Sequence, residues 1–265
     1  MSPEEGEPFS FDVSHRPELP HLPGVFITSA GRGEGKTLVA GAVARHLRHA
    51  GRDVAVFHPM ATGCRHGRGG LVSGEADFLA ACADSRMLLS EIAPVRTSLP
   101  AAPAEAADEP TPAVDLEALF EAWRRLAAEA EAAVVEGAGG LLGQITDDFW
   151  TLHLARMLAL PVVLVVRPGP GALNHALLTV HVARSAGLEL AGVVVNHFLE
   201  DTAAEPDAAV YMQTQPARIA HLAGVDILAV VPEDAANSIA KATLAESAQF
   251  AIDQAPWETI VFGRP

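Results

Sequence analysis

Short, continuous runs of apolar residues recur along the chain, and a segment with helical spacing follows most of them. Runs of this kind are typical of strands that are buried on both faces of a sheet. The sequence predicts six strands, at residues 25–28, 54–58, 133–136, 162–166, 192–196 and 227–231. It predicts helices at residues 38–49, 76–83, 116–132, 152–160 and 174–186. Strands that alternate with helices require crossover connections, so we expect an α/β fold with a mostly parallel sheet and helices on both faces.

Two stretches stand apart from this pattern. Residues 1–22 are acidic and rich in proline, without the basic start and apolar core of a signal peptide, and are expected to form a flexible or loosely docked N-terminal extension. Residues 94–112 hold five prolines and few large apolar side chains, which predicts a loop insertion. The tail after Pro232 is expected to pack as a helix and an edge segment. Residues 23–265 are therefore expected to form a single domain.

Composition narrows the class of protein. Hydrophobic residues make up 49% of the 265 residues and charged residues 19%, which is enough apolar material for a sizeable core. The formal net charge of −15 disfavours a general nucleic-acid binder, and no run reaches the ~18 apolar residues of a membrane span. Cys64 and Cys82 have neither metal-ligand spacing nor a disulfide pattern, which suggests a reducing cytoplasm. We expect a cytoplasmic protein with no nucleic-acid partner and no membrane contact.

The first predicted strand enters the turn SAGRGEGKT, residues 29–37. A phosphate-binding loop needs small residues whose backbone N–H groups can point at oxygen atoms, a lysine for the β- and γ-phosphates, and a hydroxyl for Mg²⁺. Gly33 and Gly35 provide the flexibility, and Lys36 and Thr37 provide the charge and the metal ligand. Ala30 stands where the strict motif has glycine. The strand before the turn and the helical pattern after it nevertheless favour a P-loop nucleotide site.

A second polar element follows the predicted strand at residues 133–136. Glu136 ends this strand, and Gly137, Ala138 and Gly139 follow at once. A carboxylate that leaves a strand beside a phosphate loop is suited to be a second Mg²⁺ ligand, and the glycines let the backbone approach a bound molecule closely. The two elements together predict a site for ATP and Mg²⁺.

Four segments of the sequence form a combined signature, which is more specific than any one of them. They are SAGRGEGKT, VVEGAGG, PMATG at residues 59–63, and GALNHALLTVHVARSAGLELAGVVVNH at residues 171–197. In combination they resemble the dethiobiotin synthetases, and the resemblance runs from about residue 24 to residue 234. It implies a P-loop NTPase type of fold and an enzyme of biotin biosynthesis. Such an enzyme uses ATP, Mg²⁺ and CO₂ to close a cyclic urea on 7,8-diaminopelargonate through a phosphorylated carbamate. The resemblance also implies a homodimer with substrate bound near the subunit interface.

The resemblance assigns a role to each matching residue. The ATP phosphates would contact Gly33, Glu34, Gly35, Lys36, Thr37 and Leu38. Mg²⁺ would be held by Thr37, Glu75 and Glu136, with Asp77 as the alternative to Glu75. Further nucleotide contacts would come from Glu136, Gly137, Ala138 and Gly139. The base would meet Asn196, His197, Pro232 and Glu233, and the substrate would contact Thr62, Gly139 and Asn174. By residue type alone, Asn174 would also suit the N-cap of its helix.

Two residues depart from the pattern of this family. His58 stands where the family has a lysine that is expected to contact the carbamate and the transferring phosphate. Histidine has a reference pKa of about 6.5 and is only fractionally charged at neutral pH, so less charge would be neutralised there. Arg32 stands where a small polar residue is usual, and its guanidinium could reach phosphate oxygens. We therefore take Lys36, His58 and Arg32 as the candidate catalytic residues.

Three other functions remain open on the sequence alone. The chain could be a related P-loop ATPase that acts on another small amine or carboxylate, although it is too short for the extra glutaminase domain of the cobyrinate amidating enzymes. It could be a dimerising nucleotide switch of the partitioning ATPase kind. It could also be a weakened homologue that binds nucleotide and does little else, because His58 replaces the family lysine.

Overall fold

The computed structural model describes residues 10–100, 114–202 and 206–263, and its centre is a six-stranded parallel sheet. The strands follow the order β12-β11-β10-β1-β7-β2. Their bounds are β1 Gly24–Ser29, β2 Val54–Phe57, β7 Ala132–Glu136, β10 Val162–Val166, β11 Leu190–Phe198 and β12 Ile227–Pro232. All six predicted strands are present, and each ends within two residues of its expected bounds.

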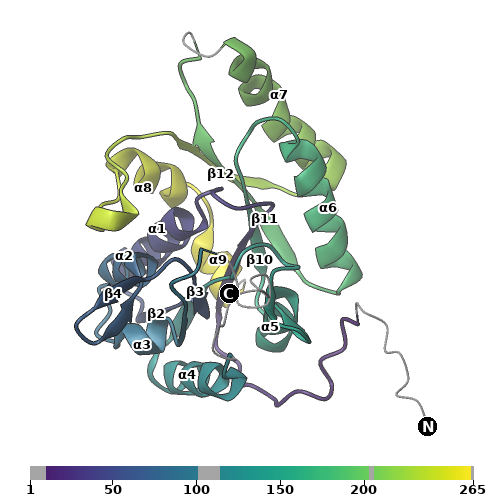
Figure 1. The fold of residues 1–265 in the computed structure, drawn as a ribbon. Coiled ribbons are helices and arrows are strands. Elements are labelled where there is room, and N and C mark those ends of the chain that lie inside the picture. Colours follow the sequence, from purple (N-terminus) through teal and green to yellow (C-terminus); the bar gives the residue numbers. More distant parts are fainter. Residues whose placement is uncertain (1–9, 101–113, 203–205, 264–265) are drawn as a thin grey trace.

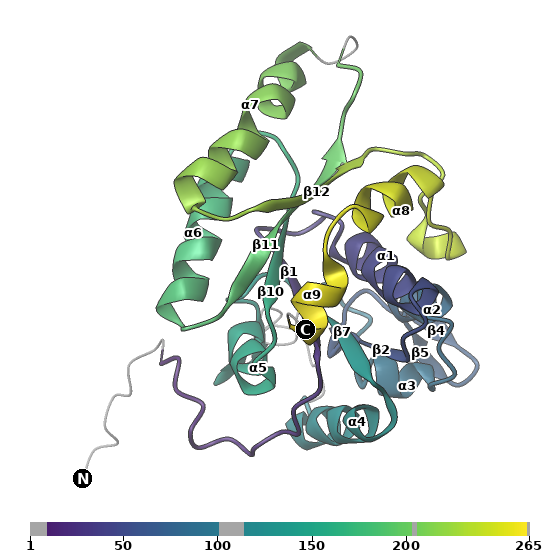
Figure 2. The same cartoon turned by 180° about the vertical axis from the view of Figure 1, so that it is seen from behind.

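Helices cover both faces of this sheet (Figures 1 and 2), which confirms the predicted fold class. The helices are α1 Lys36–His49, α2 Gly74–Cys82, α3 Leu89–Ile92, α4 Leu116–Glu129, α5 Thr151–Leu158, α6 Ala172–Ser185, α7 Pro206–Ala223, α8 Glu246–Asp253 and α9 Trp257–Phe262. Alternate residues of β1 face opposite sides of the sheet. Val25 and Ile27 pack in the core under α1, α2, α8 and α9, whereas Phe26 packs in the core under α4 and α5. Helices α6 and α7 share a third core with β10 and β11.

Helix α4 shows how the sequence sets both ends of an element. Asp115 caps its start by accepting a hydrogen bond from Ala118 N at 3.1 Å. The buried side chains Trp123 and Leu126 lie on the face that packs against the sheet. The helix ends at Glu129, before the predicted residue 132, because Ala132 already pairs with β2 as the first residue of β7.

Three short two-stranded sheets lie beside the main sheet. They are β3 Met60–Ala61 with β6 Val95–Arg96, β4 Arg65–Gly67 with β5 Gly70–Val72, and β8 Gln144–Thr146 with β9 Phe149–Trp150. Strand β6 falls within the predicted loop insertion at residues 94–112. Its pairing with β3 shows that the insertion begins with an ordered segment. Residues 101–113 of that insertion lie outside the described residues.

The structure describes most of both ends of the chain. Residues 10–22 of the predicted flexible extension make defined contacts: Trp123 Nε1 donates to the carbonyl of Pro20 at 2.9 Å, and Leu22 is buried. Residues 1–9 lie outside the described residues. After Pro232, a short 3₁₀ turn (Ile239–Lys241) precedes α8 and α9, and no residue among 233–263 joins the main sheet. The expected edge segment is therefore absent from this range, and β12 itself is an edge of the sheet.

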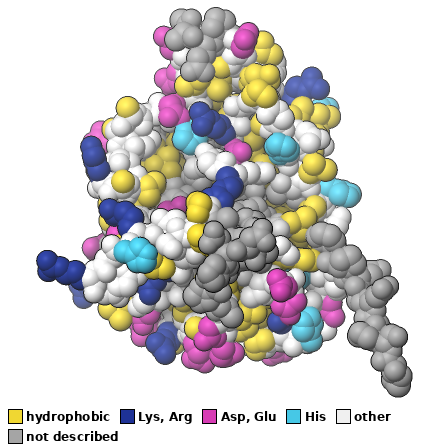
Figure 3. All heavy atoms as spheres, viewed as in Figure 1, with side chains coloured by type: hydrophobic (Ala, Val, Ile, Leu, Met, Phe, Trp, Pro, Cys, Tyr) yellow, Lys and Arg dark blue, Asp and Glu magenta, His cyan; other side chains and the backbone are white. Residues whose placement is uncertain are grey.

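The surface carries charges of both signs. Figure 3 shows acidic and basic side chains interspersed over one face. Within the described ranges, no helix has the length and apolar character that a bilayer crossing requires.

Candidate active site

The turn between β1 and α1 has the geometry of a phosphate-binding loop. Gly33 and Gly35 have φ angles of 74° and 86°, in the region that favours glycine. Gly35 is the N-cap of α1, and no described side chain caps this helix end. The first N–H groups of α1 are therefore available to an anion, which the positive end of the helix dipole also favours.

Asn196, on β11, fixes the backbone of this loop. Its Nδ2 donates to the carbonyl of Glu34 at 2.9 Å, and its side chain is fully buried. A Cβ on Gly35 would lie 2.0 Å from Asn196 Nδ2, so only glycine fits at that position. The carboxylate of Glu34 accepts a hydrogen bond from the backbone N–H of Arg167, at the end of β10. The phosphate loop is thus held in place by two neighbouring strands of the sheet.

Lys36 points back across the loop. Its Nζ donates to Ser29 Oγ at 3.1 Å, and the same hydroxyl donates to the carbonyl of Gly31 at 2.5 Å. Ser29 is 1% exposed, so its hydroxyl holds the ammonium group beside the loop in the absence of an anion. A bound phosphate would offer Lys36 a stronger, charge-assisted partner.

Thr37 and Glu136 come together although they are far apart in the chain. Thr37 Oγ1 donates to Glu136 Oε1 at 2.8 Å, and both side chains are buried. The other carboxylate oxygen, Oε2, has no hydrogen-bond partner within the described ranges. Burial raises the pKa of Glu136 above its ordinary value, a shift that His58 opposes and Glu75 reinforces. A buried carboxylate of this kind is expected to have a positively charged partner when the protein functions.

His58 lies between two carboxylates. Its Nε2 is 3.0 Å from Glu75 Oε2, and its Nδ1 is 3.8 Å from Glu136 Oε2. Burial opposes charge on the ring, but Glu136 and Glu75 outweigh it and raise the pKa of His58 above its ordinary value. The pKa of Glu75 is lowered, because the hydrogen bond and charge of His58 outweigh the effect of burial. The raised pKa shifts the ring of His58 toward its charged form relative to an ordinary histidine.

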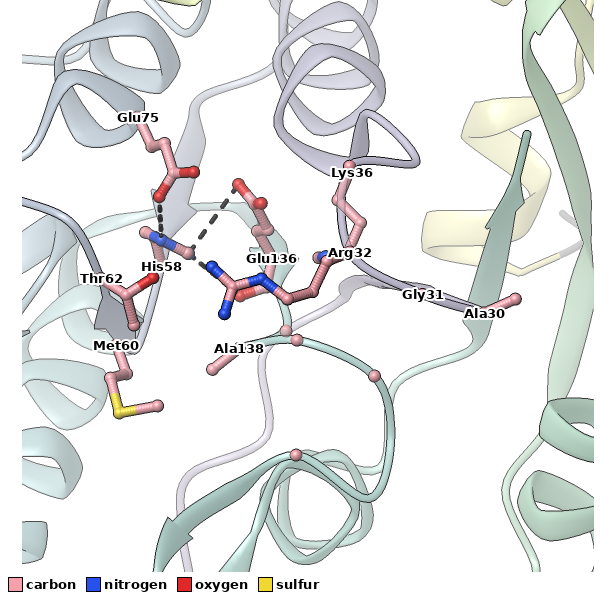
Figure 4. Close-up of a pocket in the computed structure, with 15 residues that line it drawn as sticks. Ala30, Gly31, Arg32, Lys36, His58, Met60, Thr62, Glu75, Glu136 and Ala138 are labelled. Carbon is pink, nitrogen blue, oxygen red and sulfur yellow. Dashed lines mark hydrogen bonds and ion pairs between the residues drawn. The ribbon is translucent and has the colours of Figure 1, made fainter. Parts of the chain in front are cut away.

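A cavity of about 270 Å³ opens above these groups (Figure 4). The phosphate loop, the β2–β3 segment, the start of α2 and the glycine-rich turn after β7 all contribute to its wall. Predicted residues in the wall are Arg32, Gly33, Lys36, His58, Thr62, Glu75, Glu136, Gly137, Ala138 and Gly139. In Figure 4 the exposed Arg32 side chain reaches from the phosphate loop toward the His58 side of the cavity. All three candidate catalytic residues therefore line one space.

A second cavity, of about 310 Å³, shares part of this wall. Gly33, Lys36, Glu75 and Glu136 line both spaces. The remaining wall of the second cavity comes from Gly35, Thr37, Leu38, His197, Asn237, Ser238 and Ile239. Two cavities that meet at a lysine and two carboxylates can hold two molecules that exchange a group at that point.

Some predicted residues lie elsewhere. Asn174 is exposed and lines neither cavity, and α6 begins at Ala172 with Gly171 as N-cap, so the expectation that Asn174 caps this helix is wrong. Asp77, the alternative metal ligand, also lines neither cavity, whereas Glu75 lines both.

Of the four predicted base-binding residues, only His197 lines the second cavity, and Asn196, Pro232 and Glu233 line neither cavity. Asn196 lies inside β11 rather than at its end, and its Oδ1 is buried with no partner in the described ranges. His197 lines the cavity, and its Nδ1 pairs with Glu233 Oε2. Pro232 is the last residue of β12 and lines neither of the two cavities.

Several lining residues were not predicted from the sequence. Asn237, Ser238 and Ile239 follow a turn after β12, and they carry no motif that would mark them. Ser29 lines neither cavity but contacts Lys36, and a buried polar residue at the end of a strand next to the loop is a signal that the sequence analysis did not use.

The residues present fit a nucleoside triphosphate with a divalent cation. The unpartnered Glu136 oxygen, the Thr37 hydroxyl and the uncapped start of α1 supply a carboxylate, a hydroxyl and an anion site in one place. No group of three or more His, Cys, Asp or Glu side chains in the described ranges could hold a metal ion by itself. A Mg²⁺ ion needs no such cage, because it is usually held by one or two carboxylates together with phosphates and water.

Sequence comparison identifies relatives over most of the chain. Residues 23–238 match the family described as AAA domain. The ATP-dependent dethiobiotin synthetase BioD of Anaeromyxobacter dehalogenans is 40% identical over 209 residues, which cover 79% of this chain and 89% of that protein. BioD of Bacillus subtilis subsp. natto is 32% identical over 211 residues, which cover 79% of this chain and 87% of that protein.

Solved structures of similar fold have lower sequence identity. A chain of the MinC:MinD cell division protein complex of Aquifex aeolicus has a TM-score of 0.57 and 15% identity, and the match covers 92% of this chain and 97% of that one. MinD of Pyrococcus horikoshii, complexed with Mg-ADP, has a TM-score of 0.52 and 16% identity, with 88% and 93% covered. At these identities the likeness concerns the fold alone, and it agrees with the predicted P-loop NTPase type.

Proposed function

Because the chain belongs to the ATP-dependent dethiobiotin synthetase family, we propose that it closes the cyclic urea of dethiobiotin on 7,8-diaminopelargonate with CO₂ and ATP. The observation that carries this proposal is the meeting of Lys36, Thr37 and Glu136 at the junction of two cavities. One cavity would take the nucleotide and the other the diamine. The reaction is a step of biotin biosynthesis.

Lys36 and the start of α1 would hold the triphosphate. The ammonium group needs to leave Ser29 Oγ, 3.1 Å away, to meet the β- and γ-phosphates. The backbone of residues 33–37 would surround the phosphates, with Leu38, His197 and the segment 237–239 lining the nucleoside side of the cavity. Asn196 is fully buried and lines neither cavity, so its role here would be to hold the Glu34 carbonyl rather than to meet the base.

Thr37, Glu136 and Glu75 would hold Mg²⁺. Thr37 and Glu136 are already in contact, and the free Oε2 of Glu136 would supply a ligand. Glu75 is joined to this pair through His58 and is partly exposed, so it would reach the ion directly or through water. When bound, MgATP supplies the phosphoryl group that activates the carbamate oxygen.

The other chemical requirement is neutralisation of charge around the carbamate. One amine of the substrate would add to CO₂ and lose a proton to give a carbamate anion, whose oxygen would attack the γ-phosphorus as the bond to the departing ADP oxygen breaks. The carbamate and the phosphoryl group are both anionic, so cations around them would reduce their repulsion. His58 and Arg32 place two cationic groups on this cavity, and Thr62 adds a hydroxyl. The second amine then attacks the carbonyl carbon and expels phosphate. The protein needs no covalent nucleophile, because orientation and charge supply the catalysis.

We also propose that the protein is a homodimer. Asn174, the predicted substrate residue outside the cavities, and Leu178 stand four residues apart on the same face of α6. Leu178 is 55% exposed, so it would gain from burial in an interface. An interface on this face would bury Leu178 and could bring Asn174 to the cavity of the other subunit. Light scattering on wild type and Leu178→Glu tests this, and an unchanged monomeric mass in both would contradict it.

Formation of the product tests the proposed function directly. The protein is incubated with diaminopelargonate, bicarbonate and MgATP, and dethiobiotin is detected by mass spectrometry. The sequence holds two lysines, Lys36 and Lys241, which provides a matched pair of variants. We expect Lys36→Met to abolish product formation and Lys241→Met, at an exposed residue, to leave it unchanged. Wild-type protein that hydrolyses ATP without forming dethiobiotin would support another small substrate instead.

A further inference from the structure

The β10–α6 loop, residues 167–171, is fixed by a side chain of α7. Gln215 is 6% exposed, its Nε2 donates to the carbonyl of Gly169 at 2.7 Å, and its Oε1 accepts from Gly169 N at 2.8 Å. A side-chain amide that makes both bonds to one residue fixes the position and the orientation of that backbone segment. Ala172 N in turn donates to the carbonyl of Gly169 at 3.2 Å, so the first turn of α6 begins on the residue that Gln215 holds.

The other end of this loop is joined to the phosphate loop by Glu34. The Glu34 carboxylate accepts a hydrogen bond from Arg167 N. The Glu34 backbone has little freedom, because Asn196 Nδ2 donates to its carbonyl and leaves no room for a side chain at Gly35. A movement of the Glu34 backbone would therefore change its contact with Arg167. The Glu34 side chain joins two loops that lie far apart in the sequence but follow the neighbouring strands β1 and β10.

The placement of an acidic residue inside a phosphate loop also needs an explanation. A carboxylate that faced the phosphates would repel them. The bond to Arg167 N directs the Glu34 carboxylate away from that space, toward the β10–α6 loop. Burial raises the pKa of this carboxyl above its ordinary value, while the Arg167 N–H and the charges of Lys36, Arg167 and His197 act in the opposite direction.

We propose that Glu34 and Gln215 are positioning residues that couple the phosphate loop to the first turn of α6. Bound nucleotide restrains the backbone of residues 33–37, and the Glu34 carboxylate in turn restrains the backbone of Arg167. Because Gln215 holds Gly169, the same restraint reduces the motion of the first turn of α6. Because α6 carries Asn174, and this part of the inference rests on the proposed function, nucleotide binding would strengthen binding of the diamine. By linkage, the diamine would strengthen binding of the nucleotide by the same factor.

Amide hydrogen exchange measured by mass spectrometry tests the coupling on the full-length protein. The sequence of the loop is Arg-Pro-Gly-Pro-Gly, and proline has no N–H, so residues 167–171 hold only three exchangeable backbone amides. Two of these, Arg167 N and Gly169 N, make the proposed bonds. We expect Glu34→Leu to raise the exchange rate of Arg167, and Gln215→Met that of Gly169, by about 10- to 100-fold.

Two variants control for unrelated effects. Glu34→Gln keeps an acceptor oxygen at the same reach and should stay within about threefold of wild type. Gln254→Met removes an exposed amide that bonds to the backbone of its own helix, and should leave the β10–α6 loop unchanged. Should Glu34→Leu fail to fold, Gln215→Met still tests the other half of the link, because the two side chains hold different amides.

The second arm adds Mg²⁺ and a non-hydrolysable ATP analogue. In wild type the analogue should slow exchange at Arg167 further, and in Glu34→Leu this added protection should disappear. The dissociation constant of the analogue should be unchanged or lower in Glu34→Leu, since a carboxylate is removed from beside the phosphates, whereas general damage to the loop would raise it. The KM for diaminopelargonate should rise about tenfold, and Glu34→Gln should restore it.

Two results would overturn the coupling. One is that the exchange rates of Arg167 and of Gly169 are each the same in wild type, Glu34→Leu and Gln215→Met. The other is that the analogue protects Arg167 equally in wild type and in Glu34→Leu. Assays of dethiobiotin on the same proteins separate this inference from the proposed function. Wild type that makes no dethiobiotin refutes the function, and the exchange data then still decide the link. An active wild type with unchanged exchange in the variants refutes the link alone.

Discussion

Replacement of His58 by glutamine would remove the one cationic ring between two carboxylates. His58 is 4% exposed, and its ring nitrogens lie 3.0 Å from Glu75 Oε2 and 3.8 Å from Glu136 Oε2. Removal of one partner from a buried ion pair destabilises a protein by about 3–5 kcal/mol, because the remaining charge is left without compensation. The Glu75 side chain is 40% exposed and partly screened by water, so we expect about 3 kcal/mol, the lower end of this range.

The dependence of this effect on pH has a definite sign. The folded-state pKa of His58 is raised above the unfolded value of about 6.5. The stabilisation is therefore complete below about pH 6.5 and is lost as the pH rises through the folded-state pKa. The pKa of Glu75 is lowered, so its contribution is present above about pH 4.5 and is lost as the pH falls. The difference between wild type and His58→Gln should be largest near pH 5.5–6.5 and should shrink at higher pH.

Equilibrium unfolding in urea, in EDTA to exclude metal ions, measures this difference between about pH 5 and pH 9. His46→Gln is the matched control, since His46 forms a surface pair with Asp253 at 2.8 Å and should contribute less than about 1 kcal/mol. A His58→Gln deficit no larger than that of His46→Gln, or one that grows as the pH rises, would refute the account of a buried charged pair.

Three further substitutions test other parts of the site. Arg32→Ala should lower kcat/KM by about 10- to 100-fold through loss of a cation near the carbamate, and unchanged turnover and ATP affinity would exclude that role. Gly35→Ala should unfold the loop or abolish nucleotide binding, because its Cβ would lie 2.0 Å from Asn196 Nδ2. The double variant with Asn196→Ala should lose this clash but keep the backbone strain of φ 86° at residue 35, so full recovery of nucleotide binding would contradict the role of the strain. Glu75→Gln should weaken Mg²⁺-dependent nucleotide binding about 10-fold, whereas Asp77→Asn should not. Equal weakening in the two variants would contradict the assignment of Glu75 as the metal ligand.

The sequence predicted the sheet well for a physical reason. Strands buried on both faces must be continuously apolar, so their runs are visible without any knowledge of tertiary contacts. The phosphate loop and Glu136 were equally visible, because each combines a strand end with a glycine-rich turn. The sequence predicts the ends of elements less well where they depend on backbone conformation. Gly171, with φ 79°, is the N-cap of α6, although Asn174 is the better residue type for that position.

Long-range contacts account for most of what the sequence could not provide. The charge state of His58 depends on Glu75, 17 residues away, and Glu136, 78 residues away. Nothing local to His58 indicates either partner. The same holds for Glu34 and Arg167, which are 133 residues apart, and for the wall at Asn237–Ile239, which only the path of the chain after β12 brings to the second cavity.

Calorimetric titration of ATP with and without Mg²⁺ tests the central claim most directly, namely that Lys36, Thr37 and Glu136 meet on one metal-bound triphosphate. We expect wild type to bind ATP more tightly when Mg²⁺ is present. Glu136→Gln should still bind metal-free ATP but lose this magnesium-dependent gain, because the free carboxylate oxygen is absent. An equal gain in the two proteins, or no magnesium-dependent binding by wild type, would contradict the account.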